Sequence, residues 1–147
     1  MVVVDRREDD VAREGLIGRV VTDELRAHDR NVALVLNRAA SPGKHLSLCT
    51  GSVADVEEAM QAGRTQAGAL LADELFLPQV DKELIATLCR PSPWLLTDAL
   101  SIGIFETYSA ASTLLGSDAA CKVAEITIAM LRLCDGIGGK GFAVFVG

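Results

Sequence analysis

The sequence is poor in the residues that most often form metal, redox and stacking sites. Only 4% of its 147 residues are aromatic, and it has two histidines. Its four cysteines stand far apart with no Cys-x-x-Cys pair, which predicts reduced, mostly buried thiols, no metal site and no cofactor. Because 50% of the residues are hydrophobic, the chain can still bury a core, packed by Ala, Val, Leu and Ile rather than by rings.

Basic clusters, a secretory signal and long apolar runs are also missing. The formal net charge is −6, and no run of Lys or Arg offers a phosphate-binding stripe, which argues against a nucleic-acid partner. The N-terminus reaches charged residues too early for a secretory signal, and no apolar run approaches the ~20 residues that span a bilayer. The sequence therefore predicts a cytoplasmic protein with no nucleic-acid and no membrane partner.

What the sequence does contain is an internal repeat. Asp135–Gly147 has the same layout as Ser41–Gly51: a glycine-rich turn, one lysine, a short apolar strand and a final glycine. The two stretches align at an offset of 96 residues, and upstream of them the strand 31–36 aligns with 125–130 at an offset of 94. These matches predict one supersecondary unit written twice, with the second copy ending after its loop and strand.

Apolar spacing predicts the elements of each copy. The first copy is predicted to contain strands at 2–4, 31–38, 45–50 and 74–77, a helix over 11–27, a helix after Ser52 and a short helix capped by Asp81. The second is predicted to contain strand 99–105, helix 109–124, strand 126–133 and the final loop and strand. The expected fold class is α/β (α+β), a mixed or antiparallel sheet with helices on one face.

The helix after Ser52 carries the clearest pattern. Ser52 is a typical N-cap residue, with Asp55 three residues on as its capping-box partner. Apolar residues then recur on one face, which is predicted to pack on the core: Val53, Val56, Met60, Ala67 and Leu70.

Proline marks the division between the two copies. Pro91-Ser92-Pro93 ends the helical spacing and favours an extended chain. The predicted organisation is a first domain over 1–90, a proline-containing linker over 91–97, and half of a second domain over 98–147.

The two Gly-Lys turns admit two interpretations. Glycine lets backbone N–H groups approach an anion and lysine adds a charge, which is typical of a nucleotide or phosphate site. A P-loop, however, has Gly-Lys-Ser/Thr opening a helix, whereas here Gly43-Lys44 and Gly139-Lys140 open strands. The simpler interpretation is a tight turn between strands with solvated lysines.

No pattern of catalytic residues stands out. The one candidate nucleophile and base, Cys49 and His45, lie four residues apart on a predicted strand. That spacing separates them by roughly 13 Å, too far for hydrogen-bonded activation. The sequence therefore predicts that the protein is not an enzyme.

Five motifs follow one another along the chain. They are Ser41-Pro-Gly-Lys-His-Leu46, Thr50-Gly-Ser-Val-Ala-Asp-Val-Glu-Glu-Ala59, Ser101-Ile-Gly-Ile-Phe-Glu-Thr107, Ser117-Asp-Ala-Ala-Cys-Lys122 and Gly136-Ile-Gly-Gly-Lys140. Together they resemble the bacterial microcompartment shell proteins, and more narrowly their tandem-domain class that forms trimers. The resemblance covers nearly the whole chain from about Gly18.

The resemblance implies a structural protein of two fused shell domains. Three copies would close into a flat pseudohexagonal tile, and tiles would pack edge to edge with other shell proteins into a shell in the cytoplasm. The turns of both domains would line a central pore for small metabolites, through Ser41, Pro42, Gly43, Lys44, Gly136, Ile137, Gly138 and Gly139. Lys122 matches the family's edge lysine, which contacts a neighbouring tile, and Arg26 is a stand-in for it in the first copy.

The sequence departs from the family pattern in three places. Ser41 stands where some tandem members have a cysteine that holds an iron–sulfur cluster, so no cluster is expected. The strand 2–4 lacks the family's Gly-Ile-x-Glu pattern. By internal comparison, the second copy lacks about forty residues, which predicts a fragment, a degraded gene product or a half completed by another subunit. The alternative function is a small oligomeric α/β protein that senses nucleotide or phosphate at the Gly-Lys loops.

Overall fold

The computed structural model describes residues 2–4, 33–39, 44–89, 100–134 and 136–147. It divides into two compact units, which we call unit 1 (Met1–Phe76) and unit 2 (Leu77–Gly147). The predicted helix 11–27, the turn 41–43 and the linker 91–97 lie outside the described residues.

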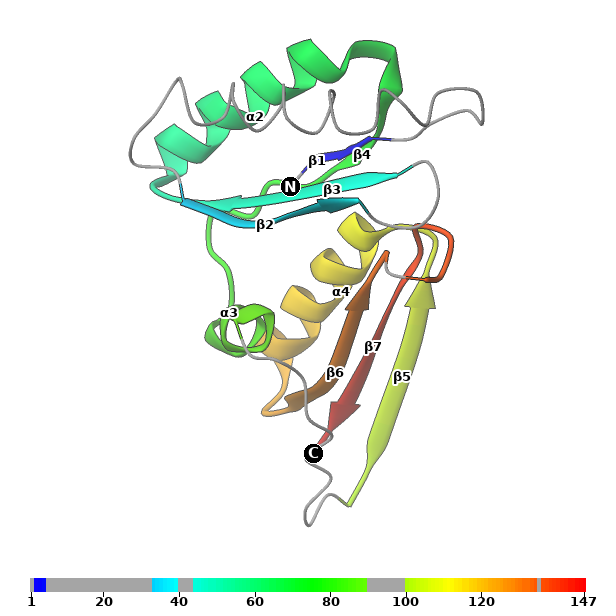
Figure 1. Cartoon of the computed structure of the whole chain (residues 1–147). Coiled ribbons are helices and arrows are strands. Elements are labelled where there is room, and N and C mark those ends of the chain that lie inside the picture. The colour runs from blue at the N-terminus through cyan, green and yellow to red at the C-terminus, as the bar shows by residue number, and fades with distance from the viewer. Residues whose placement is uncertain (1, 5–32, 40–43, 90–99, 135) are drawn as a thin grey trace. The chain divides into compact units, whose positions relative to one another are not determined.

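The described part of unit 1 is a four-stranded antiparallel sheet with a helix across it (Figure 1). The strands are β1 (Val2–Val4), β2 (Ala33–Ala39), β3 (His45–Thr50) and β4 (Leu71–Glu74), in the order β2-β3-β1-β4. Every described pairing in it is antiparallel, including that of β2 with β3, the strands on either side of the first Gly-Lys turn.

Helix α2 (Val53–Ala67) confirms the predicted cap and only the middle of the predicted stripe. The Ser52 Oγ accepts a hydrogen bond of 3.2 Å from the Asp55 N–H. Met60 and Ala67 are buried, together with Gly63, which the sequence places on the same face, and with Ala59, which the prediction left out. The prediction was wrong for Val53 and Leu70, which are 51% and 41% exposed.

The position predicted for the strand over 74–77 was wrong. Helix α2 ends at Ala67 because Gly68, at φ +50°, leaves the helix while its N–H still bonds the Arg64 carbonyl. A short 3-10 turn, η2 (Gly68–Leu70), follows, and β4 runs over Leu71–Glu74. The chain turns back onto the sheet three residues earlier than the apolar spacing indicates.

In its described residues, 77–89, 100–134 and 136–147, unit 2 holds a three-stranded antiparallel sheet and two helices. The strands are β5 (Ile102–Thr107), β6 (Thr127–Leu133) and β7 (Gly141–Val146), in the order β5-β7-β6. The strand predicted over 99–105 instead runs to Thr107, because Glu106 and Thr107 still pair with Phe142 and Gly141 of β7.

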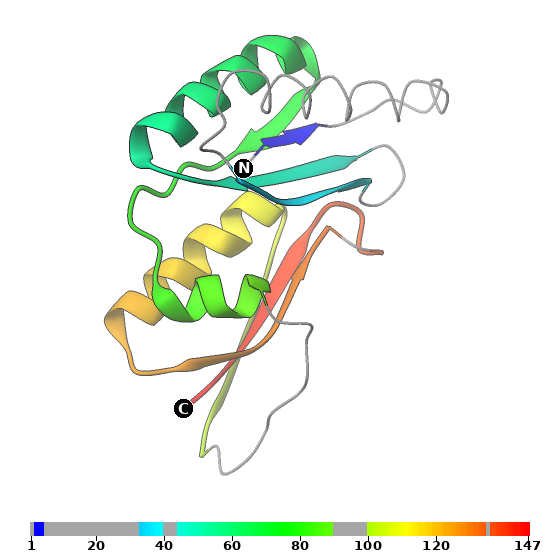
Figure 2. The same ribbon diagram turned by 60° about the vertical axis from the view of Figure 1, so that its left-hand side comes forward.

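Two helices pack within unit 2. Helix α4 (Ala110–Val123) contacts all three strands, and α3 (Lys82–Cys89) contacts α4 and β6 (Figures 1 and 2). The predicted cap at Asp81 is confirmed, since Asp81 Oδ1 accepts from the Glu83 N–H, and Ser109 caps α4 by accepting from the Ser112 N–H with its Oγ. The predicted first domain includes the residues of α3, whereas by packing α3 belongs to unit 2.

The hairpins of the two units repeat the same pairing. In unit 1 the register between β2 and β3 shifts between Leu34 and Leu36, and in unit 2 the register between β6 and β7 shifts between Ile128 and Met130. These positions lie 94 residues apart in both cases, which is the offset of the sequence repeat. The two copies therefore share a bulge as well as a strand order.

Small residues bring α4 close to the sheet. A Cβ on Gly141 would lie 2.0 Å from the Thr113 Oγ1, and one on Gly116 would lie 3.0 Å from the Phe105 ring. The Thr113 hydroxyl is fixed between the Ser109 carbonyl (3.0 Å) and the Thr107 hydroxyl (2.6 Å), so it has no room to withdraw.

We expect Gly141→Ala to lower the free energy of unfolding by ~1–3 kcal/mol, because the added methyl overpacks the contact with Thr113. Gly103→Ala is the matched control, since Gly103 lies in β5 with nothing within 4 Å of its Cβ position. Denaturant unfolding of the two variants measures the difference; equal stabilities would show that α4 moves freely away from β7.

Candidate functional site

The second predicted pore loop is a turn between β6 and β7 with an unusual backbone. Gly136, Gly138 and Gly139 have φ of +70°, +67° and +82°, in the left-handed region that side chains disfavour. Nothing lies within 4 Å of a Cβ built on Gly136 or Gly138. Glycine is therefore required at these two positions by the course of the backbone and not by close packing.

Cys134 ties the base of this loop together. It is fully buried and, at φ +65°, is the non-glycine residue with positive φ among those described. Its N–H donates to the Lys140 carbonyl at 2.8 Å, and its thiol donates to the Gly139 carbonyl at 3.5 Å. The two ends of the loop are thereby held against each other, which fixes the turn at the end of the hairpin.

The first predicted pore loop is described only at Lys44. Ser41, Pro42 and Gly43 lie outside the described residues, as does Arg26. Lys44 is half-buried and directly precedes β3, in the place that Lys140 holds before β7.

Lys140 has partners within its own unit. Its Nζ lies 3.2 Å from the Glu106 Oε1 and 6.0 Å from the centre of the Tyr108 ring. These residues, with Thr107, surround a small open pocket of about 190 Å³. Because a carboxylate already faces the ammonium, this pocket does not present the free positive charge that a nucleotide phosphate site uses.

Lys122, the predicted edge residue, lies in the last turn of α4. Its Nζ contacts the Asp118 Oδ2 at 2.5 Å and donates to the Gln79 carbonyl at 2.5 Å, and its side chain stays 44% exposed. A cation in the last turn also complements the helix dipole. Its ammonium is thus held by two partners, while part of the side chain stays exposed.

The candidate nucleophile and base are not activated. Burial lowers the pKa of His45 and raises the pKa of Cys49, so both side chains favour their neutral forms. In the described parts of the chain, no three His, Cys, Asp or Glu side chains gather as metal ligands would. Within the same residues, no helix is long and apolar enough to cross a membrane.

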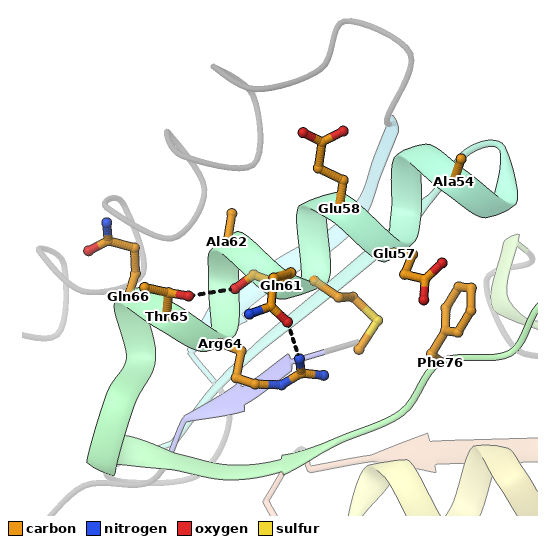
Figure 3. Close-up of a pocket in the computed structure, with 10 residues that line it drawn as sticks. Ala54, Glu57, Glu58, Gln61, Ala62, Arg64, Thr65, Gln66 and Phe76 are labelled. Atoms are coloured by element: carbon orange, nitrogen blue, oxygen red, sulfur yellow. Dashed lines mark hydrogen bonds between the residues drawn. The ribbon is translucent and has the colours of Figure 1, made fainter.

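A hollow of about 720 Å³ lies along α2, lined by residues of that helix and by Phe76 (Figure 3). Among its described lining residues the basic group is Arg64, which bonds both oxygens of Glu74 at 2.7–3.0 Å and also contacts the Gln61 side chain. Glu57 and Glu58 are exposed. The hollow is lined by both apolar and polar side chains, and its arginine is already paired.

Sequence reasoning did not anticipate the partners of Lys122 and Lys140. The four-residue spacing of Asp118 and Lys122 is a signal for an ion pair on one helix face. The bonds from Asp118 to Asp81 and from Lys122 to Gln79 span 37 and 43 residues and have no local signal.

We expect Gly138→Ala to destabilise the protein by ~1 kcal/mol, because alanine is strained at a positive φ even where space is open. Gly103→Ala is the control, because Gly103 also has open space around its Cβ position but has no positive φ. It measures the effect of replacing a glycine by alanine without the backbone strain. Denaturant unfolding provides the measurement, and equal stabilities of the two variants would contradict a left-handed residue at 138.

Comparisons with known proteins agree with one another. The BMC domain family matches residues 29–80. The curated protein "Bacterial microcompartment shell protein PduT" of Citrobacter freundii is 31% identical over 117 residues, which cover 80% of this chain. The chain spans 62% of the length of that relative.

A solved structure extends the likeness to the fold. The crystal structure of a microcompartment protein from Desulfitobacterium hafniense DCB matches with a TM-score of 0.80 and 31% identity. The match covers 99% of this chain and 75% of that one. With its antiparallel sheets, capped helices and glycine-turn hairpin, the chain belongs to the BMC-domain family of bacterial microcompartment proteins.

Proposed function

We propose that this protein is a non-enzymatic structural component of a bacterial microcompartment shell. Three copies form a pseudohexagonal tile with a central pore for small metabolites, and tiles associate edge to edge with other shell proteins in the cytoplasm. Family membership and the name of the Citrobacter freundii relative support the shell role.

The observation that carries the proposal is the repeated hairpin. One chain holds two hairpins with the same bulge, each with a Gly-Lys turn at the same end. In a closed assembly with threefold symmetry, each kind of turn occurs three times around the axis. Two kinds of turn from three chains give the six positions of a hexagonal rim.

The geometry of the second loop suits a pore rim. At Gly136 and Gly138 the loop carries no side chain, and no neighbouring atom lies within 4 Å of the Cβ positions. Cys134 holds the base of the loop, so the turn keeps its form without support from a ligand. We infer that Gly136, Ile137, Gly138 and Gly139 line the pore together with Ser41, Pro42, Gly43 and Lys44.

Native mass spectrometry, with electron microscopy at high protein concentration, tests the proposed assembly. We expect three chains per particle and extended sheets of particles. A monodisperse monomer at high concentration would contradict the tile. A stabilisation of several degrees by ATP in a thermal-shift assay would instead favour the alternative, a nucleotide-sensing protein.

We expect Lys122→Ala to abolish sheets while the three-chain particles persist, because the exposed part of this side chain is the proposed contact between tiles. Lys82→Ala removes an exposed lysine from α3 and serves as the control. Sheets of normal extent from the Lys122 variant would assign the edge contact to other residues.

A further inference from the structure

Residues 79–89 precede the proline linker in the sequence but pack as part of unit 2. We call this segment the strap. It consists of Gln79, Val80 and Asp81 followed by helix α3, and it lies against α4 and β6 (Figure 2). Its contacts are of two kinds, a polar cluster at its start and an apolar anchor in α3.

The polar cluster centres on Asp118 of α4, which is 3% exposed. The Oδ1 of Asp118 accepts from the Asp81 N–H at 2.8 Å, and its Oδ2 accepts from the Lys122 Nζ at 2.5 Å. The same Nζ donates to the Gln79 carbonyl at 2.5 Å. A buried carboxylate is tolerated only with partners. Here Asp118 bonds the strap directly at Asp81, and it also bonds Lys122, which in turn bonds the strap at Gln79.

The helical part of the strap is anchored by two side chains. Leu84 is 1% exposed, and the Glu83 Oε1 accepts from the Ile128 N–H of β6 at 3.2 Å. Asp81 in turn caps the helix by accepting from the Glu83 N–H at 2.8 Å. These bonds link Asp118 to Asp81, Asp81 to Glu83, and Glu83 to β6. Loss of the bond at Asp118 therefore weakens the placement of Asp81 and, through it, of Glu83.

A thiol on α4 lies near the acidic residues of the strap. Cys121 lies one turn along α4 from Asp118 and is partly buried. Burial raises its pKa to about 11, with the carboxylates of Asp81, Glu83 and Asp118 adding to the rise. With the strap closed, this thiol is therefore a poor nucleophile at neutral pH.

We propose that the strap is a separately opening element that Asp118 holds closed, and that its opening exposes Cys121 while the sheet β5-β7-β6 stays folded. The sheet has its own hydrogen bonds and its own packing against α4, through Gly141 and Phe105, which do not involve the strap. Local opening of such a peripheral helix costs less than global unfolding.

Asp118→Asn tests the latch in the full-length protein. The amide keeps an acceptor for the Asp81 N–H but loses the charge that pairs with Lys122. We expect hydrogen exchange of the amides from Glu83 to Cys89 to accelerate on the order of 10- to 100-fold. The amides of β7 should keep their wild-type exchange.

Alkylation of Cys121, followed by peptide mass spectrometry, gives a second readout. Asp118→Asn also removes one carboxylate that raises the pKa of Cys121, so the alkylation rate is measured against pH to separate ionisation from access. Leu84→Ala releases the strap without changing any charge, and it should raise the alkylation rate at every pH below the thiol pKa. Leu84→Ala also tests the proposal if the Asp118→Asn variant does not fold.

Two controls match the substitutions. Glu125→Gln neutralises an exposed carboxylate just beyond α4, and Leu115→Ala removes a leucine that is 51% exposed on α4. Both should leave strap exchange and Cys121 alkylation unchanged. The proposal is overturned if strap amides exchange at wild-type rates in both test variants. It is also overturned if the exchange of the β7 amides accelerates as much as that of the strap amides. These measurements do not depend on the association of tiles, so a negative result would not contradict the proposed tile.

Discussion

The antiparallel register of the two hairpins is the constraint on which the rest of this structure depends. Pairing of β6 with β7 and of β2 with β3 fixes which residues reach the turn, and the shared bulge between Leu34 and Leu36 or Ile128 and Met130 keeps both hairpins in the same register. A slip of one residue would turn every side chain of a strand to the other face. The glycine turns are therefore placed by strand pairing, and the helices pack on the faces that this pairing creates.

The scarcity of aromatic residues has a structural consequence. With few rings to fill space, α4 lies so close to the sheet that glycine is needed at 141 and at 116, where side-chain atoms stand 2.0 and 3.0 Å from a hypothetical Cβ. One aromatic pair, Phe105 and Phe145, packs at 5.2 Å between ring centres beside this contact. Packing by small residues leaves little tolerance, since an added methyl group has no void to enter.

Several charges that look free in the sequence are paired in the fold. Lys140 faces Glu106, Arg64 forks onto Glu74, and Lys122 joins Asp118. The exposed pairs add little stability because water screens them. The buried carboxylate of Asp118 differs, since it has lost its hydration and depends on its partners. In unit 2, Asp118 is thus a buried charge that depends on the bonds from Asp81 and Lys122.

Local chemistry in the sequence determined the caps at Ser52, Asp81 and Ser109 and both hairpins, because each depends on residues close together in the chain. The offset of 94 residues between strands 31–36 and 125–130 is also the offset between the two register shifts. The end of α2 at Gly68 was missed, because an apolar stripe continues in the sequence past the residue that breaks the helix. Only the tertiary structure decided that α3 packs on α4 and that Asp118 bonds Asp81, 37 residues away, since contacts between distant segments arise from packing and carry no local pattern.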